Sequence, residues 1–253
     1  MKKHIKILKR KLKIFDPKLK EECGVFGISN AKDASALTAL GLHALQHRGQ
    51  DSTGVVTSDK VNFFAHRGMG QVSEVFSDKK VFSHLKGDLS IGHNRYGTTG
   101  ESALKNVQPL FSELNIGGLA IAHNGNITNA LTLRNQLVQD GAIFQSTSDT
   151  ETILQLVARS RKESRVSRFA DALRHVEGAF ALVALTSDKL IGVRDPFGIR
   201  PLVLGKHGDS FILSSETCAL DIIGAEFVRE IENGEIVVIS NEGVQSIKPF
   251  NII

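Results

Sequence analysis

Short apolar segments, separated by glycine and polar residues, dominate the chain after residue 22. Segments of this length that are rich in Val, Ile and Phe and bounded by turn-forming residues are typical of β-strands. The pattern predicts strands over 24–29, 54–58, 61–66, 90–94, 119–123, 180–186, 190–194, 201–205, 210–215 and 235–240.

Apolar residues at steps of three and four predict helices over 34–47, 129–140, 150–161 and 166–176. The second of these helices has Thr128 at its expected N-cap and Gly141 just past its end. The helices are grouped between blocks of strands and do not follow every strand, which favours antiparallel sheets covered by helices. The pattern therefore predicts an α+β fold with a single domain over 23–253.

Residues 1–22 form a Lys-rich leader whose pattern of apolar and charged residues differs from that of the rest of the chain. Its apolar residues recur at steps of three and four, so that a helix would carry one apolar stripe: Ile5, Leu8, Leu12, Phe15 and Leu19. The pattern admits a solvated extension, a membrane-surface segment, an organelle-targeting peptide or a removable pro-segment. The leader has no Ser or Thr and its basic residues are almost all Lys, which disfavours the targeting peptide.

The net charge of +4 is concentrated in the leader. Of 31 basic and 27 acidic residues, nine and three lie in 1–22, which leaves 22 basic and 24 acidic residues in 23–253. A basic excess would favour nucleic acid as a partner. Because the domain over 23–253 is nearly neutral, we expect no nucleic-acid partner. With no apolar run of about 18 residues, we expect no membrane partner. The two cysteines are too few for a disulfide framework, which favours the cytoplasm.

Cys23 lies at the junction between leader and domain, and four polar segments follow it: 47–52, 93–98, 123–126 and 148–151. Each lies at the end of a predicted strand or the start of a predicted helix, where backbone groups are free and functional side chains collect. A single such Cys is more often a small buried hydrophobe, and a single such loop is more often a turn. Together they predict a catalytic site.

These segments, with 195–202 (DPFGIRPL), 215–220 (SETCAL) and 234–238 (GEIVV), resemble the class II (N-terminal nucleophile) glutamine amidotransferases. Within that class, the similarity is greatest to the glutaminase half of the amidophosphoribosyltransferase family, and it runs from Cys23 to the C-terminus. The resemblance implies a four-layer αββα sandwich of two antiparallel sheets between helical layers. It also implies release of ammonia from glutamine in the first step of purine nucleotide biosynthesis.

The resemblance implies that Cys23 is the nucleophile, activated by its own α-amine once residues 1–22 are removed as a pro-segment. An α-amine titrates near ~7.7–8.0 and a thiol near ~8.5, so that one can take the other's proton close to neutral pH. Asn124 and Gly125 match the oxyanion hole, through a side-chain amide and a backbone N–H.

Arg95 matches the residue that binds the α-carboxylate of glutamine, and Asp149 matches the acceptor for its α-ammonium. Four further residues match the pocket lining or the loop expected to close over substrate: Arg48, Gly49, Tyr96 and Thr98. For Arg48 and Gly49, a salt bridge and a turn are the structural alternatives. Tyr96 could equally be a packing residue.

We predict no metal site in this chain. His43 and His47 are four residues apart but lack the Glu of the zinc-protease motif, which indicates a helix face, and Cys218 is expected to be a core thiol. In the family, Mg²⁺ and, in some relatives, an iron–sulfur cluster belong to a phosphoribosyltransferase half that is absent from this sequence. Expected partners are L-glutamine, a separate phosphoribosyltransferase chain and further copies of this chain. The alternatives are a truncated, non-catalytic relic and a glutamine- or partner-binding module.

Overall fold

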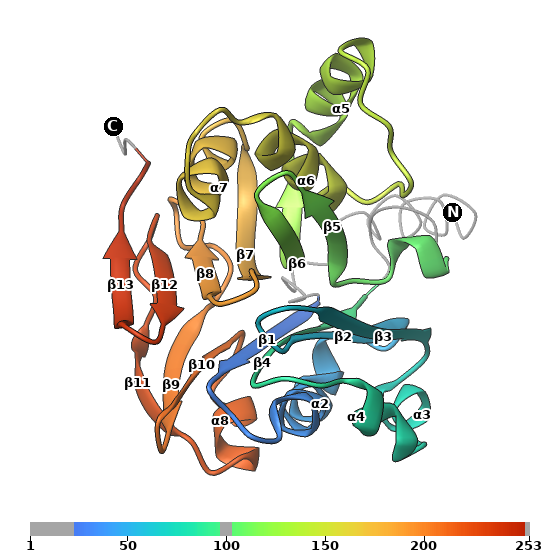
Figure 1. The fold of residues 1–253 in the computed structure, drawn as a ribbon, viewed down its shortest axis with the longest axis vertical. Helices are drawn as coiled ribbons and strands as arrows, with labels where there is room; N and C mark the ends of the chain where they lie inside the picture. The colour runs from blue at the N-terminus through green and yellow to red at the C-terminus, as the bar shows by residue number, and fades with distance from the viewer. Residues whose placement is uncertain (1–22, 97–102, 251–253) are drawn as a thin grey trace, which may run out of the picture.

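The computed structural model describes residues 23–96 and 103–250, so the leader and Thr98 lie outside the described residues. Two antiparallel sheets form the middle of the molecule (Figure 1). The seven-stranded sheet has the order β11 (Glu226–Glu230), β9 (Val203–His207), β10 (Ser210–Ser214), β1 (Gly24–Ser29), β4 (Leu89–Arg95), β2 (Ser52–Ser58) and β3 (Phe63–Met69). The six-stranded sheet has the order β13 (Gly243–Ile247), β12 (Ile236–Ser240), β8 (Leu190–Arg194), β7 (Gly178–Leu185), β6 (Gly117–Ile127) and β5 (Leu110–Leu114).

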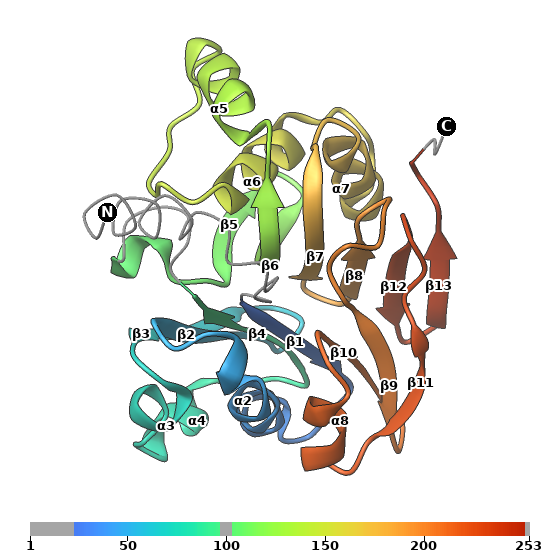
Figure 2. The same cartoon turned by 180° about the vertical axis from the view of Figure 1, so that it is seen from behind.

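Helices cover the outer face of each sheet (Figures 1 and 2). The seven-stranded sheet is covered by α2 (Ala34–Ala44), α3 (Val72–Val75), α4 (Lys80–His84) and α8 (Cys218–Ile222). The six-stranded sheet is covered by α6 (Thr150–Arg159) and α7 (Arg165–Leu173), with α5 (Ala130–Gln139) projecting beyond them. The short 3₁₀ turns are η2 (Gln46–Arg48) and η3 (Leu104–Asn106).

The alternation of side chains along β6 shows how the layers are held together. Leu119 and Ile121 belong to the apolar cluster shared with α6 and α7, whereas Ala120 and Ala122 belong to the cluster between the two sheets. Successive strand residues face opposite sides of a sheet. The next residue of the second series, Asn124, therefore faces the other sheet, and the four-layer αββα sandwich is confirmed.

Most of the predicted elements are present, with shifted ends. The helix predicted over 34–47 ends at Ala44, and the N-cap of α5 is Asn129, so the assignment of Thr128 was wrong. The N–H of Thr128 instead donates to Glu177 O (2.8 Å), which continues the pairing of β6 with β7. None of the described helices has the length and apolarity needed to cross a membrane.

Three strands and three helices were not predicted: β5, β11, β13, α3, α4 and α8. The three strands are short and have many exposed positions, and β5, β11 and β13 each form the edge of a sheet. The three helices have four or five residues each, too few for a helical period to be recognised.

Candidate active site

Cys23 lies directly before β1, beside the end of β4. Gly24 pairs with Asn94, and the sulfur of Cys23 accepts a hydrogen bond from the N–H of Tyr96 at 3.4 Å. The backbone of Cys23 has a φ of 67°, a region that residues other than glycine seldom adopt and that is often found at functional sites. The structure thus places Cys23, Arg95 and Tyr96 together, where the central strands β1 and β4 of the seven-stranded sheet begin and end.

Arg48 holds the backbone of Cys23 from two directions. Its Nε donates to Cys23 O at 2.7 Å, and its own carbonyl accepts from Cys23 N at 2.9 Å. The side chain is 1% exposed, and its guanidinium also pairs through Nη1 with Glu216 Oε1. Arg48 therefore combines the predicted place beside the nucleophile with the salt bridge that was its structural alternative.

Glu216 is a site residue that the sequence analysis did not identify. Its carboxylate accepts from Arg48 and contacts His47 Nε2 at 3.1 Å. Burial raises the pKa of Glu216, but the hydrogen bond and charge of Arg48, followed by His47, outweigh burial and hold the pKa below its usual 4.5. At neutral pH the carboxylate is ionised and balances the charge of the buried guanidinium.

Gly49 allows the loop after η2 to pass close to β4. A Cβ atom at this position would lie 2.6 Å from the carbonyl carbon of Arg95 and 2.8 Å from its oxygen. Two residues on, Asp51 N donates to Arg95 O at 3.0 Å. Only glycine fits this approach, which seats the backbone of Arg95 beside the loop that carries Arg48.

Asn124 on β6 is completely buried, and neither polar atom of its amide has a hydrogen-bond partner among the described residues. Leaving a buried amide unpaired costs about 1–3 kcal/mol. Gly125 follows with a φ of 147°, and a Cβ there would lie 2.1 Å from Ala179 O. Of the two residues predicted to form the oxyanion hole, Asn124 thus has a buried amide that is unpaired among the described residues, and Gly125 occupies a position where only glycine fits.

The second half of β6 extends beyond β5, so its N–H groups on that side are not paired with a strand of the sheet. Pairing with β5 stops at Ile121, and the N–H groups of His123 and Ile127 donate instead to Gln108 Oε1 (2.8 Å) and Asp149 Oδ2 (3.1 Å). Alternate residues of a strand direct their N–H groups to the same edge. The N–H of Gly125 therefore faces this edge, between those two bonds, where β6 has no further strand beside it.

Asp149 begins α6 next to this edge. Its Oδ1 lies 3.6 Å from His123 Nδ1, while its Oδ2 accepts from Ile127 N. Burial raises the pKa of Asp149, but the charge and hydrogen bond of His123 and the N–H of Ile127 hold it below the usual 3.8. An ionised, mostly buried carboxylate at this point suits recognition of an ammonium group.

A pair of buried histidines connects the two sheets beneath the site. His93 Nε2 contacts His123 O at 3.0 Å, which joins the end of β4 to the middle of β6. Burial lowers the pKa of His93 to about 3, so its ring is neutral and donates from Nε2. This bond brings the strand that carries Arg95 next to the strand that carries Asn124 and Gly125. Both histidines lie in segments that the sequence singled out, but neither was assigned a role.

Cys218 is less buried than predicted. It packs partly against the cluster of α2 and α8, but its sulfur lies 3.6 Å from Glu216 Oε2. The expectation of a core thiol therefore holds only in part, because α8 begins beside His47 and Glu216, which are partly exposed. Tyr96 is 43% exposed at the end of β4, which argues against its packing alternative.

Known proteins share both this sequence and this fold. A family profile described as "Glutamine amidotransferase domain" matches residues 93–221. An amidophosphoribosyltransferase of Rhizobium etli is 58% identical over 87% of this chain and 44% of its own length, and a chloroplastic one of Glycine max is 47% identical over 92% and 41%.

A solved structure from the same family has a similar fold. The glutamine phosphoribosylpyrophosphate amidotransferase of Bacillus subtilis, complexed with ADP and GMP, superposes with a TM-score of 0.86 at 42% identity, over 91% of this chain and 50% of that one. The chain thus spans about half the length of the relatives it matches. Since the family profile covers half of the chain and the fold is shared, the chain belongs to the class II glutamine amidotransferase family.

Proposed function

We propose that this domain hydrolyses the side-chain amide of L-glutamine through a Cys23 thioester, as the glutaminase part of an amidophosphoribosyltransferase in the first step of purine nucleotide biosynthesis. The observation that carries the proposal is the buried amide of Asn124, which has no hydrogen-bond partner in the part of the chain that the structure describes and lies on the sheet facing that of Cys23. A site that keeps such donors unpaired suits a reaction in which an oxyanion develops.

In the first half-reaction, the sulfur of Cys23 attacks the amide carbon and its proton passes to the α-amine of the same residue. Asn124 Nδ2 and the N–H of Gly125 donate to the developing oxyanion. The tetrahedral adduct then collapses to the thioester, and the ammonium formed from the α-amine returns its proton to the departing nitrogen as ammonia leaves. Water hydrolyses the thioester to glutamate and restores the thiol.

The basic α-amine exists only if residues 1–22 have been removed, because a peptide nitrogen has no basic lone pair. Arg48 O already accepts a hydrogen from this nitrogen at 2.9 Å. After cleavage the same contact would orient the amine beside its own thiol. Removal of the leader is therefore part of the proposal.

Arg95 and Asp149 would hold the two charged groups of the substrate. A guanidinium matches the planar α-carboxylate with two parallel hydrogen bonds, and the ionised Asp149 accepts from the α-ammonium. Since Arg95 is buried and the side chain of Asp149 is only 11% exposed, an amide that lacks either charged group would leave one of them uncompensated.

Transfer of the ammonia to phosphoribosyl pyrophosphate needs an acceptor site that we assign to a phosphoribosyltransferase half. This half would be supplied by a partner chain or by a longer form of this protein, and it would also hold the Mg²⁺ and any iron–sulfur cluster. We further propose homo-oligomers and a cytoplasmic location, for which two free cysteines are suitable.

Intact-mass analysis of the purified protein tests the proposal together with a glutaminase assay. We expect a form that begins at Cys23, releases ammonia from glutamine and is alkylated at Cys23 by a glutamine analogue. Cys23→Ala should lower turnover by about 10⁴-fold or more with an unchanged unfolding temperature. An uncleaved chain that binds glutamine without hydrolysing it would instead support the binding module, and a chain that does neither would support the relic.

A further inference from the structure

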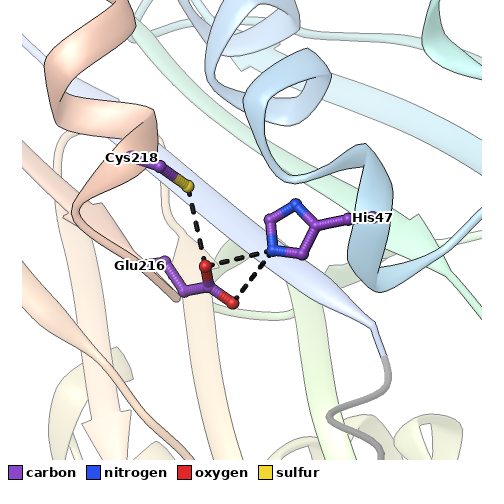
Figure 3. Close-up of side chains that lie close together, drawn as sticks. All are labelled: His47, Glu216 and Cys218. Atoms are coloured by element: carbon purple, nitrogen blue, oxygen red, sulfur yellow. Dashed lines mark hydrogen bonds and ion pairs between the residues drawn. The ribbon is translucent and has the colours of Figure 1, made fainter.

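Three side chains with metal-binding atoms converge around Glu216, the partner of Arg48 (Figure 3). His47 comes from η2, Glu216 from the turn after β10 and Cys218 from the start of α8. Their ligand atoms all lie within 4.8 Å of one another. We propose that these three residues form a binding site for a borderline-soft divalent cation of the Zn²⁺ type.

The two distances to Glu216 Oε2 are close to those between ligand atoms around a bound ion. With bonds of about 2.0–2.3 Å, tetrahedral zinc ligands lie roughly 3.3–3.8 Å apart. Here His47 Nε2 is 3.1 Å from Glu216 Oε2, and Cys218 Sγ is 3.6 Å from the same oxygen. His47 Nε2 and Cys218 Sγ lie within 4.8 Å of each other, so side-chain shifts of about 1 Å or less would bring all three ligand atoms to the spacing of a bound ion.

The orientation of His47 is the strongest argument for a cation. Its Nδ1 lies 3.1 Å from Ala44 O, and because a carbonyl can only accept, Nδ1 must carry a hydrogen. A neutral ring then turns the lone pair of Nε2 toward the carboxylate oxygens of Glu216, at 3.1–3.2 Å. Two acceptors at this distance need a proton or a metal ion between them. A backbone carbonyl that fixes the other ring nitrogen is the usual support of a metal-binding histidine.

One carboxylate oxygen of Glu216 is available to the ion, and the cluster is open to solvent. Arg48 pairs with Oε1 of Glu216, which holds the carboxylate in place and leaves Oε2 directed at His47 and Cys218. The side chains of His47 and Glu216 are 57% and 34% exposed, so an ion can enter from solvent and keep a water ligand. Three protein ligands and one open position are a common arrangement for zinc.

Charge balance requires Cys218 to bind as a thiolate. The thiol proton leaves to solvent as the sulfur–metal bond forms, so that two negative groups, Glu216 and Cys218, offset the ion beside the guanidinium of Arg48. Without the thiolate, the repulsion from Arg48 would oppose binding. The proposal therefore depends on the sulfur as well as on the imidazole.

Binding can be tested in the full chain carrying Cys23→Ala, where Cys218 is the only thiol. Titration with Co²⁺ should produce a thiolate-to-metal charge-transfer band, and calorimetry with Zn²⁺ should show one ion per chain. Added to this background, Cys218→Ser should abolish the band, and His47→Gln should weaken Zn²⁺ binding by at least about tenfold. His43→Gln is the matched control, because His43 is exposed one turn earlier and lies outside the cluster.

A missing charge-transfer band, or Zn²⁺ binding that is unchanged by both ligand substitutions, would overturn the site. The cluster would then be an imidazolium–carboxylate pair. Thermal unfolding of each variant separates loss of the site from loss of the fold, and His47→Gln provides a second variant if Cys218→Ser is unstable. Because the measurements use a chain without the nucleophile, their outcome is independent of whether the protein is a glutaminase.

Discussion

Asn94 at the end of β4 and Asn124 on β6 are both completely buried, but their surroundings differ. The Asn94 amide donates to Leu42 O at 2.6 Å and accepts from Thr53 Oγ1 at 2.9 Å, which ties β4 to α2 and β2. The Asn124 amide has no hydrogen-bond partner among the described residues. An unpaired buried amide lowers stability, which fits the oxyanion-binding role that we propose for Asn124.

The same contrast extends to the neighbours of the two residues. On the seven-stranded sheet, Cys23 is held through its backbone by Arg48, which is paired in turn with Glu216. On β6, the N–H of Gly125 lies on the side of β5 but beyond the last residue that pairs with β5. One region thus holds the proposed nucleophile through a satisfied network, and the other keeps the donors that we propose for the oxyanion unpaired among the described residues. Substitutions in the two regions should therefore affect different properties of the protein.

Among the substitutions that test this contrast, Asn124→Ala should have the largest effect. Loss of one oxyanion donor should lower kcat by about 10²–10³-fold. The unfolding temperature should not fall, since the substitution removes an unpaired buried amide. Ammonia release by the processed protein, measured beside a thermal melt, checks both parts. A variant that unfolds at clearly lower temperature but keeps its activity would show that Asn124 is structural.

Arg95→Lys should have the next largest effect. Lysine keeps the positive charge but cannot form two parallel hydrogen bonds to a carboxylate. The lost contact is worth about 1.5–3 kcal/mol, and we expect it mainly as a higher KM for glutamine. Steady-state kinetics with glutamine measure the change. If KM stays the same and only kcat falls, Arg95 does not bind the α-carboxylate.

Asn94→Ala should show the opposite behaviour to Asn124→Ala. The substitution removes the amide that donates to Leu42 O and leaves the hydroxyl of Thr53 with only its bond to His93 O (3.1 Å), which should cost about 1–3 kcal/mol of stability. Urea unfolding gives the loss directly. The fraction of the variant that is folded should hydrolyse glutamine with nearly the kcat of the parent protein. A large loss of turnover with unchanged stability would break the distinction between the two regions.

The smallest effect concerns the pH dependence of stability through Glu216. Its pKa in the folded protein is lower than in the unfolded chain, so its contribution is complete above about pH 4.5 and is lost as pH falls through the folded pKa. Glu216→Gln should lower stability at pH 7 by about 1 kcal/mol, because the carboxylate is partly exposed and screened. The stabilities of variant and parent, measured by urea unfolding at several pH values, should converge in acid. A constant difference across pH would contradict this role.

Much of the fold could be predicted because its signals are local. The strand–helix pattern of β6, β7, α6 and α7 is a property of consecutive residues, and it indicated antiparallel sheets covered by helices. The edge strands β5, β11 and β13 were missed because exposed edge positions do not need an apolar pattern. Their pairing depends on strands that are distant in the sequence.

By itself, the sequence determined the class of the protein, the junctional Cys23 and the segments that supply Arg95, Asn124, Gly125 and Asp149, since each is recognisable in its own motif. Only the tertiary structure decided how these groups are supported. Arg48 and Glu216 are 168 residues apart, and the bond of His93 to His123 spans the two sheets. Such pairs depend on the packing of whole layers. For the same reason, the convergence of His47 and Cys218 on Glu216 was visible only once α8 was placed beside η2.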